Sequence, residues 1–142
     1  MQVIPPIKND SNLIRFANQR HIDKNNGDFL VSAFSMRYSE DYLSFDWAEF
    51  HKFNSLDENI KYSIISILNR FYKENDKLKQ KYNDKKYFAV IDIKSLINKI
   101  SDFDIEKIKL IDNDNSHTGI YYSRDNNDKI AVILLEIANK NR

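Results

Sequence analysis

The stretch SLDENIKYSIISILNRFY, residues 55–72, carries the clearest structural signal in the chain. Ser55, followed three residues later by Glu58, forms a capping box, in which these side chains satisfy free backbone N–H groups at the start of a helix. The apolar side chains that follow recur at helical spacing: Ile60, Ile64, Ile67, Leu68 and Phe71. The stretch therefore predicts an amphipathic helix over residues 56–72 with this stripe buried.

A second principal helix is predicted over residues 128–140, where apolar residues repeat the same spacing and Asp128 stands in position to cap. Short apolar or alternating runs predict strands at 13–16, 29–34, 43–47, 87–91, 106–111 and 118–122. One or two helical turns are expected at 95–100. Since turns rather than crossover helices link most strands, we expect an α+β fold with mostly antiparallel strands.

The chain of 142 residues has the size of one domain, and 42% hydrophobic residues can form a core without disulfides. Residues 1–11, which contain Pro5-Pro6, are expected to form an extended arm. Residues 73–86 are polar and basic, and they predict either an extension of the preceding helix or a loop. The whole of 1–142 is therefore interpreted as a single domain.

Composition excludes several classes of protein. The chain has no cysteine, so disulfides and thiolate zinc sites are ruled out. No apolar run approaches the roughly 20 residues that a membrane helix needs, and residues 1–6 have no basic segment typical of a secretory signal. A cytoplasmic location without membrane association is therefore expected. The net charge of +1 gives no general argument for nucleic-acid binding.

No cofactor or metal motif is present. The only glycines are Gly27 and Gly119, too far apart to form a phosphate-binding glycine loop. Residues 112–117 begin like a calcium loop, but His117 occupies the sixth position, where glycine is required, and no glutamate stands at the twelfth. A turn stabilised by its own Asp and Asn side chains is the better interpretation. We expect neither a metal ion nor a cofactor.

Two polar clusters are candidates for chemistry. The first contains Arg15, Arg20, His21 and Asp23. Its histidine could act as a general base and its arginines could hold an anion, although a solvated turn explains the same residues. In the second cluster, residues 44–51, Ser44 and Asp46 share one face of a strand while the aromatic residues share the other. A serine of either strand, Ser32 or Ser44, could meet His117 in space.

A lysine-rich segment is a third candidate. It comprises Lys73, Lys77, Lys79, Lys81, Lys85 and Lys86, with tyrosines at 72, 82 and 87. Basic residues interleaved with aromatic residues can hold a single strand of nucleic acid by its backbone and bases. Three acidic residues lie among them, however, so a solvated helix face is the alternative, and specific nucleic-acid binding is not expected.

Several short segments bear a family resemblance. They are Leu13-Ile14-Arg15, Ile22-Asp23, Ser32-Ala33-Phe34 and Leu43-Ser44-Phe45-Asp46-Trp47. Together they resemble a group of small, uncharacterised bacterial proteins with a Ser-Ala-Phe strand, a Leu-Ser-Val strand and a C-terminal Asn-Pro-x-His-Ala segment. Residues 115–119 stand in the place of that last segment, with serine for proline and threonine for alanine. The resemblance implies a grouping of folds but no activity, and it marks positions to consider together: Arg15, Ser32, Phe34, Ser44 and His117.

Three functions remain open at this point. The first expectation is a small bacterial accessory or interaction protein without enzymatic activity, with an unidentified protein partner and a defence or conflict system as its hypothetical setting. The alternative is a transferase or hydrolase acting on a nucleotide or RNA, with Arg15, His21, Ser44 and His117 as catalytic candidates. Its binding candidates are Arg15, Ser32, Asp46 and Asn115. The third is a weak nucleic-acid binder that uses Lys77, Lys79, Lys81, Lys85 and Lys86.

Overall fold

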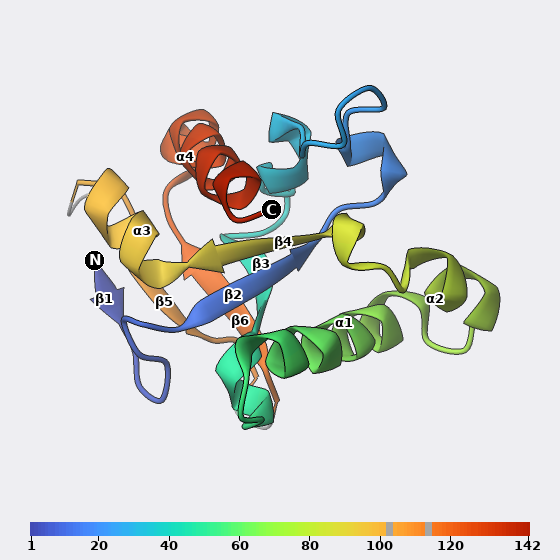
Figure 1. Ribbon diagram of the computed structural model, residues 1–142. Coiled ribbons are helices and arrows are strands. Elements are labelled where there is room, and N and C mark those ends of the chain that lie inside the picture. Colours follow the sequence, from blue (N-terminus) through green and yellow to red (C-terminus); the bar gives the residue numbers. More distant parts are fainter. Residues whose placement is uncertain (102–103, 113–114) are drawn as a thin grey trace.

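A six-stranded mixed sheet with the order β1-β5-β6-β3-β2-β4 organises the chain (Figure 1). The computed structural model describes residues 1–101, 104–112 and 115–142. The strands are β1 (Gln2–Val3), β2 (Asn12–Phe16), β3 (Tyr42–Trp47), β4 (Phe88–Asp92), β5 (Lys107–Leu110) and β6 (His117–Tyr121). Neighbouring strands are antiparallel except β1 and β5, which are parallel. The predicted α+β class with mostly antiparallel strands is confirmed, but the sheet is mixed.

The described ranges contain four α-helices rather than the two principal ones predicted. They are α1 (Leu56–Tyr72), α2 (Asp76–Tyr82), α3 (Ile93–Lys99) and α4 (Asn127–Lys140). The bounds of α1 match the prediction, and the Ser55 side chain accepts a hydrogen bond from the backbone N–H of Glu58. Asp128 does not cap α4, because Asn126 holds the cap position and Asp128 lies inside the first turn. None of these helices combines the length and apolar character needed to cross a membrane.

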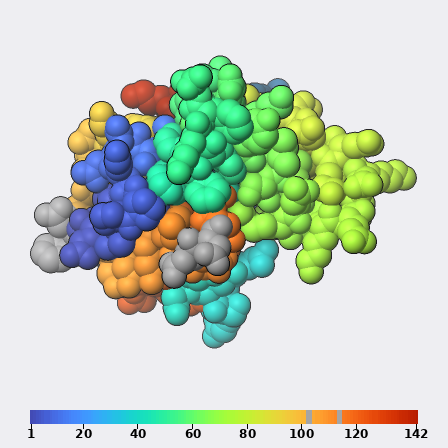
Figure 2. Space-filling view, turned by 90° about the horizontal axis from the view of Figure 1, so that it is seen from below, coloured from blue at the N-terminus to red at the C-terminus, as the bar shows by residue number. Residues whose placement is uncertain are grey.

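The two faces of the sheet are covered differently. On one face, α3 and α4 pack over the larger core, which includes Leu13, Phe45 and Ile120 (Figure 1). On the other face, α1 packs against β2 and β3, and its stripe forms a second core with Ile14 and Phe88. In the space-filling view, part of β5 and β6 reaches the surface beside α1 (Figure 2, orange beside green). Part of this second face is thus accessible to solvent, and the side chains of Lys107, Lys109, His117 and Tyr121 on it are only partly buried.

The strand predicted at residues 29–34 is wrong. Val31–Phe34 form a short 3-10 helix, η2, and Phe29 makes only an isolated bridge to Ile22. The physical reason is tertiary: η2 packs on α4, and the Arg15 guanidinium donates a hydrogen bond to the carbonyl oxygen of Ala33. Phe34 therefore contributes to the core from a turn that packs on α4.

Three smaller predictions also need correction. Residues 1–11 are not merely an extended arm, because β1 pairs with β5. Phe71 is 52% exposed, although the rest of the α1 stripe is buried. Residues 73–86 are neither a continuous extension of α1 nor a plain loop, since Lys73 at φ +44° ends α1 and the separate helix α2 follows. The ring of Tyr82 on α2 then packs edge-on against Phe16.

Candidate functional site

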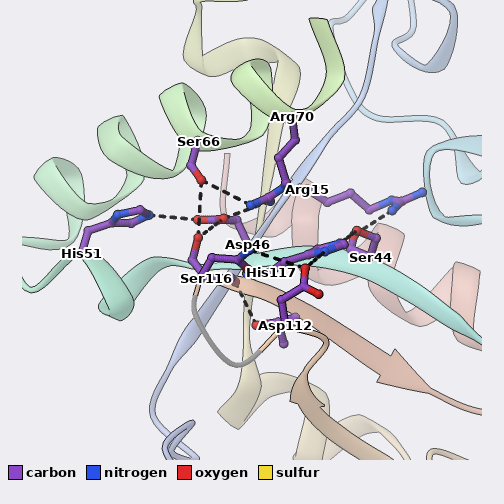
Figure 3. Close-up of polar contacts among 11 residues, drawn as sticks. Arg15, Ser44, Asp46, His51, Ser66, Arg70, Asp112, Ser116 and His117 are labelled. Atoms are coloured by element: carbon purple, nitrogen blue, oxygen red, sulfur yellow. Dashed lines mark hydrogen bonds and ion pairs between the residues drawn. The ribbon is translucent and has the colours of Figure 1, made fainter. Parts of the chain in front are cut away.

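Ser44 and His117 meet across the β3–β6 pair. Ser44 lies opposite Gly119 and Asp46 lies opposite His117, so these side chains share the face of the sheet that carries α1. The Ser44 Oγ is 2.6 Å from His117 Nε2, a short hydrogen bond between residues 73 positions apart in sequence (Figure 3). Both side chains are only partly buried. Of the two serines that the sequence left open as partners of His117, Ser44 makes the contact and Ser32 contacts His21 instead.

A carboxylate stands on the far side of the histidine ring. Asp112 Oδ2 lies 3.4 Å from His117 Nδ1, and the Asp112 side chain is 57% exposed. The backbone N–H of His117 donates to Asn115 Oδ1 at 2.8 Å, which fixes the start of β6. The order is therefore hydroxyl, imidazole, carboxylate, the arrangement in which a histidine activates a serine and an acid orients the histidine.

The surroundings of His117 favour its neutral form. Burial lowers the pKa of His117 below its ordinary value, and the nearby Arg70 guanidinium lowers it further. The hydrogen bond and charge of Asp112 act in the opposite direction. In the tautomer with the proton on Nδ1, that N–H points to Asp112 and the free Nε2 accepts the Ser44 hydroxyl. A neutral ring in this tautomer is what a general base requires.

A second polar network lies beside this one. Asp46 is fully buried, and its Oδ1 accepts hydrogen bonds from Arg70 Nη2 at 3.0 Å and from the Ser116 hydroxyl (Figure 3). Its Oδ2 lies 3.0 Å from His51 Nε2. A buried carboxylate with this many partners is satisfied, and it ties β3, α1 and the start of β6 together. Asp46 thus supports the site rather than facing a ligand.

Arg15 does not join the site. Its guanidinium donates hydrogen bonds to two backbone carbonyl oxygens, that of Ala33 in η2 at 2.6 Å and that of Ser44 in β3 at 2.8 Å. Burial lowers the pKa of Arg15 to about 10, so it stays charged at neutral pH. The contacts fasten η2 to the sheet, which is a structural role. The side chains of Ser44 and His117 therefore meet, whereas that of Arg15 does not join them.

The remaining candidates lie elsewhere. His21 Nδ1 contacts Ser32 Oγ at 2.8 Å, a separate serine–histidine pair between η1 (Gln19–His21) and η2. The lysine-rich segment begins at Lys73, directly after α1, and continues along α2 and just past it, at the far end of α1 from η3 (Ala48–His51) (Figure 1). There, Lys79 pairs with Asp76 and Lys85 pairs with Asp57. These acidic partners agree with a solvated surface for the segment.

Two partners in these networks were not predicted. The sequence predicts only a turn at Asp112, because nothing in it shows that this side chain points to the ring of His117. Arg70 lies in α1 four residues after Ser66, and the two are hydrogen-bonded beside the apolar stripe. Two polar residues four positions apart lie on the same side of a helix, so Ser66 and Arg70 could have indicated that a polar side chain of the sheet, such as Asp46, faces them.

Comparison of the chain with protein-family models, curated proteins and solved structures finds no match. Within the described ranges, no three His, Asp or Glu side chains come together in a way that could hold a metal ion. The arrangement that could support catalysis is the series of contacts from Ser44 through His117 to Asp112 (Figure 3).

Proposed function

We propose that this protein is a hydrolase or group-transfer enzyme that cleaves ester substrates with Ser44 as its nucleophile. The observation that carries the proposal is the 2.6 Å contact between Ser44 Oγ and His117 Nε2, with Asp112 on the opposite nitrogen of the ring. Direct contact of a hydroxyl with a largely neutral imidazole supports this reading above the interaction role expected from composition.

The reaction would proceed in two steps. Ser44 Oγ attacks the carbonyl carbon of the ester while its proton passes to His117 Nε2, and the C–O bond to the alcohol breaks as the alcohol takes that proton. Water, or a second alcohol in a transferase, then attacks the acyl-Ser44 ester and gives its proton to the same nitrogen. The proton finally returns to Ser44 Oγ as the acid or new ester leaves. Asp112 orients the ring and stabilises its charged form.

Hydrolysis of 4-nitrophenyl acetate by the purified protein tests the proposal. Ser44→Ala and His117→Ala should each lower kcat/KM by at least about a hundredfold, the usual contribution of a general base or more. Ser35→Ala removes an exposed hydroxyl outside the site and should leave the rate unchanged. The His117 side chain is only 20% exposed, so thermal melting of its variant is recorded beside the rate to show that the variant is folded. Hydrolysis that survives both substitutions would rule the proposal out.

A further inference from the structure

The uncovered part of the sheet beside Ser44 has a regular arrangement of side chains. Across strands β3, β6 and β5, Ser44 pairs with Gly119, and Gly119 pairs with Lys109. The next row contains Tyr42, Tyr121 and Lys107. Because paired residues of antiparallel strands point to the same face, Ser44, Tyr121 and both lysines share one surface. All four side chains are only partly buried, so this surface is accessible to solvent.

Gly119 allows the ring of Tyr121 to fold towards Ser44. A Cβ atom at position 119 would lie 2.8 Å from Tyr121 Cε1, which is closer than packed atoms allow, and 3.3 Å from Ile111 Cγ1, which is a tight contact. The Tyr121 ring therefore lies over the backbone of Gly119, and Gly119 is the residue paired with Ser44. The ring of Tyr42 packs beside it, with 5.2 Å between centroids.

Two ammonium groups gather on the same ring. Lys107 Nζ lies 5.3 Å and Lys109 Nζ 5.1 Å from the centroid of Tyr121. Lys107 also pairs with Glu106 at 3.4 Å, whereas within the described ranges Lys109 has no carboxylate within ion-pair distance. The contacts bring positive charge to the place where Tyr121 covers Gly119, beside the proposed nucleophile. Besides Glu106, the opposing charges near the Tyr121 ring are the carboxylates of Asp112 and Asp41, and Asp112 contacts His117.

We infer that Lys109, assisted by Lys107, forms an anion subsite, and that the substrate is an ester with a carboxylate or phosphate group close to its scissile bond. A charged group held here would place the ester beside Ser44, and hydrogen bonds to charged groups are the stronger ones. The inference about the substrate rests on the proposed function, but binding of an anion to the lysines does not.

Anion binding is measured first, without catalysis. The 15N-labelled protein is titrated with inorganic phosphate and, separately, with succinate, in a low-salt buffer at pH 7. We expect saturable shifts of the backbone amides of Lys107, Lys109 and Tyr121. Lys109→Met should weaken the apparent Kd about tenfold, which corresponds to one charge-assisted hydrogen bond. The control Lys94→Met, an exposed lysine on α3, should leave it unchanged. Absence of shifts on β5 and β6, or equal affinity in both variants, would overturn the subsite.

Ester selectivity is measured second. The parent protein should hydrolyse the 4-nitrophenyl monoester of succinate, which keeps a free carboxylate, with a higher kcat/KM than 4-nitrophenyl acetate. Lys109→Met should lower kcat/KM for the anionic ester about tenfold and change that for the acetate less than about twofold. Equal losses on both esters would refute the substrate class. If phosphate binds but neither ester is cleaved in a Ser44-dependent way, the proposed function fails while the anion subsite stands.

Discussion

His117 is the side chain on which pH should act most directly. Its pKa is lowered from 6.5, chiefly by burial, so the folded protein accepts a proton here less readily than the unfolded chain. The unfolded state therefore binds more protons below pH 6.5, and this group destabilises the fold as the pH falls through 6.5 towards the lowered pKa. Ester hydrolysis should also fall in this acidic range, since protonated His117 cannot act as a base.

Asp112 offers a specific test of that environment. Its hydrogen bond and its charge both raise the pKa of His117 against the effect of burial. Asp112→Asn removes the charge, so the pKa of His117 should fall further. An NMR titration of the His117 Hε1 proton in both proteins measures the change. A His117 pKa that rises or stays the same would show that the Asp112 carboxylate, 3.4 Å away, does not stabilise the protonated ring.

Asp46 should contribute strongly to stability. It is fully buried, and Arg70, His51 and Ser116 all bond to its carboxylate. Asp46→Ala leaves these partners unpaired and should lower the free energy of unfolding by about 3–5 kcal/mol. Chemical denaturation measures the loss, and Asp57→Ala, at an exposed ion pair with Lys85, provides the control and should have little effect. A small loss at Asp46 would show that the network is replaceable.

At the scale of elements, α1 depends on its buried stripe. Ile64 packs in the core between α1 and the sheet, while its neighbour Ile65 is 41% exposed. Ile64→Ala should therefore cost about 2–4 kcal/mol in urea denaturation, and Ile65→Ala clearly less. Similar losses at both positions would mean that the stripe does not face the sheet.

Local patterns predicted some elements well and others poorly. The capping box and the helical spacing of residues 55–72 predicted α1 because both signals are local. The run from Phe29 to Phe34 predicts a strand because it is short and apolar. Its conformation depends instead on tertiary contacts, above all the packing of η2 on α4 and the bond from Arg15 to Ala33. Such contacts override the weak preference of a short run.

At the scale of the whole molecule, the site is a product of strand pairing. Ser44 and His117 could be named as candidates from sequence, but only the β3–β6 register puts one beside the other. A shift of this register by one residue would turn the histidine to the opposite face. The structural role of Arg15 could not be predicted from sequence either, because its hydrogen-bond partners are carbonyl groups of segments distant in the chain.

The overall charge of the molecule limits how tightly it can bind nucleic acids. The net charge is +1, and acidic side chains pair with Lys79 and Lys85 in the lysine-rich segment. We expect only weak binding of single-stranded RNA, lost between about 50 and 200 mM salt, because few phosphate contacts can form. Fluorescence anisotropy with labelled RNA at both salt concentrations measures this. Tight, sequence-dependent binding at the higher concentration would contradict the expectation.

His117 is proposed to make Ser44 a nucleophile. A fluorophosphonate probe, which transfers its phosphonyl group to an activated serine with loss of fluoride, tests this most directly when peptide mass spectrometry locates the label. We expect modification of Ser44, abolished in His117→Ala and slowed in Asp112→Asn, with Ser32 and Ser35 unmodified. A protein that stays unlabelled at Ser44, or labels there equally fast without His117, would contradict it.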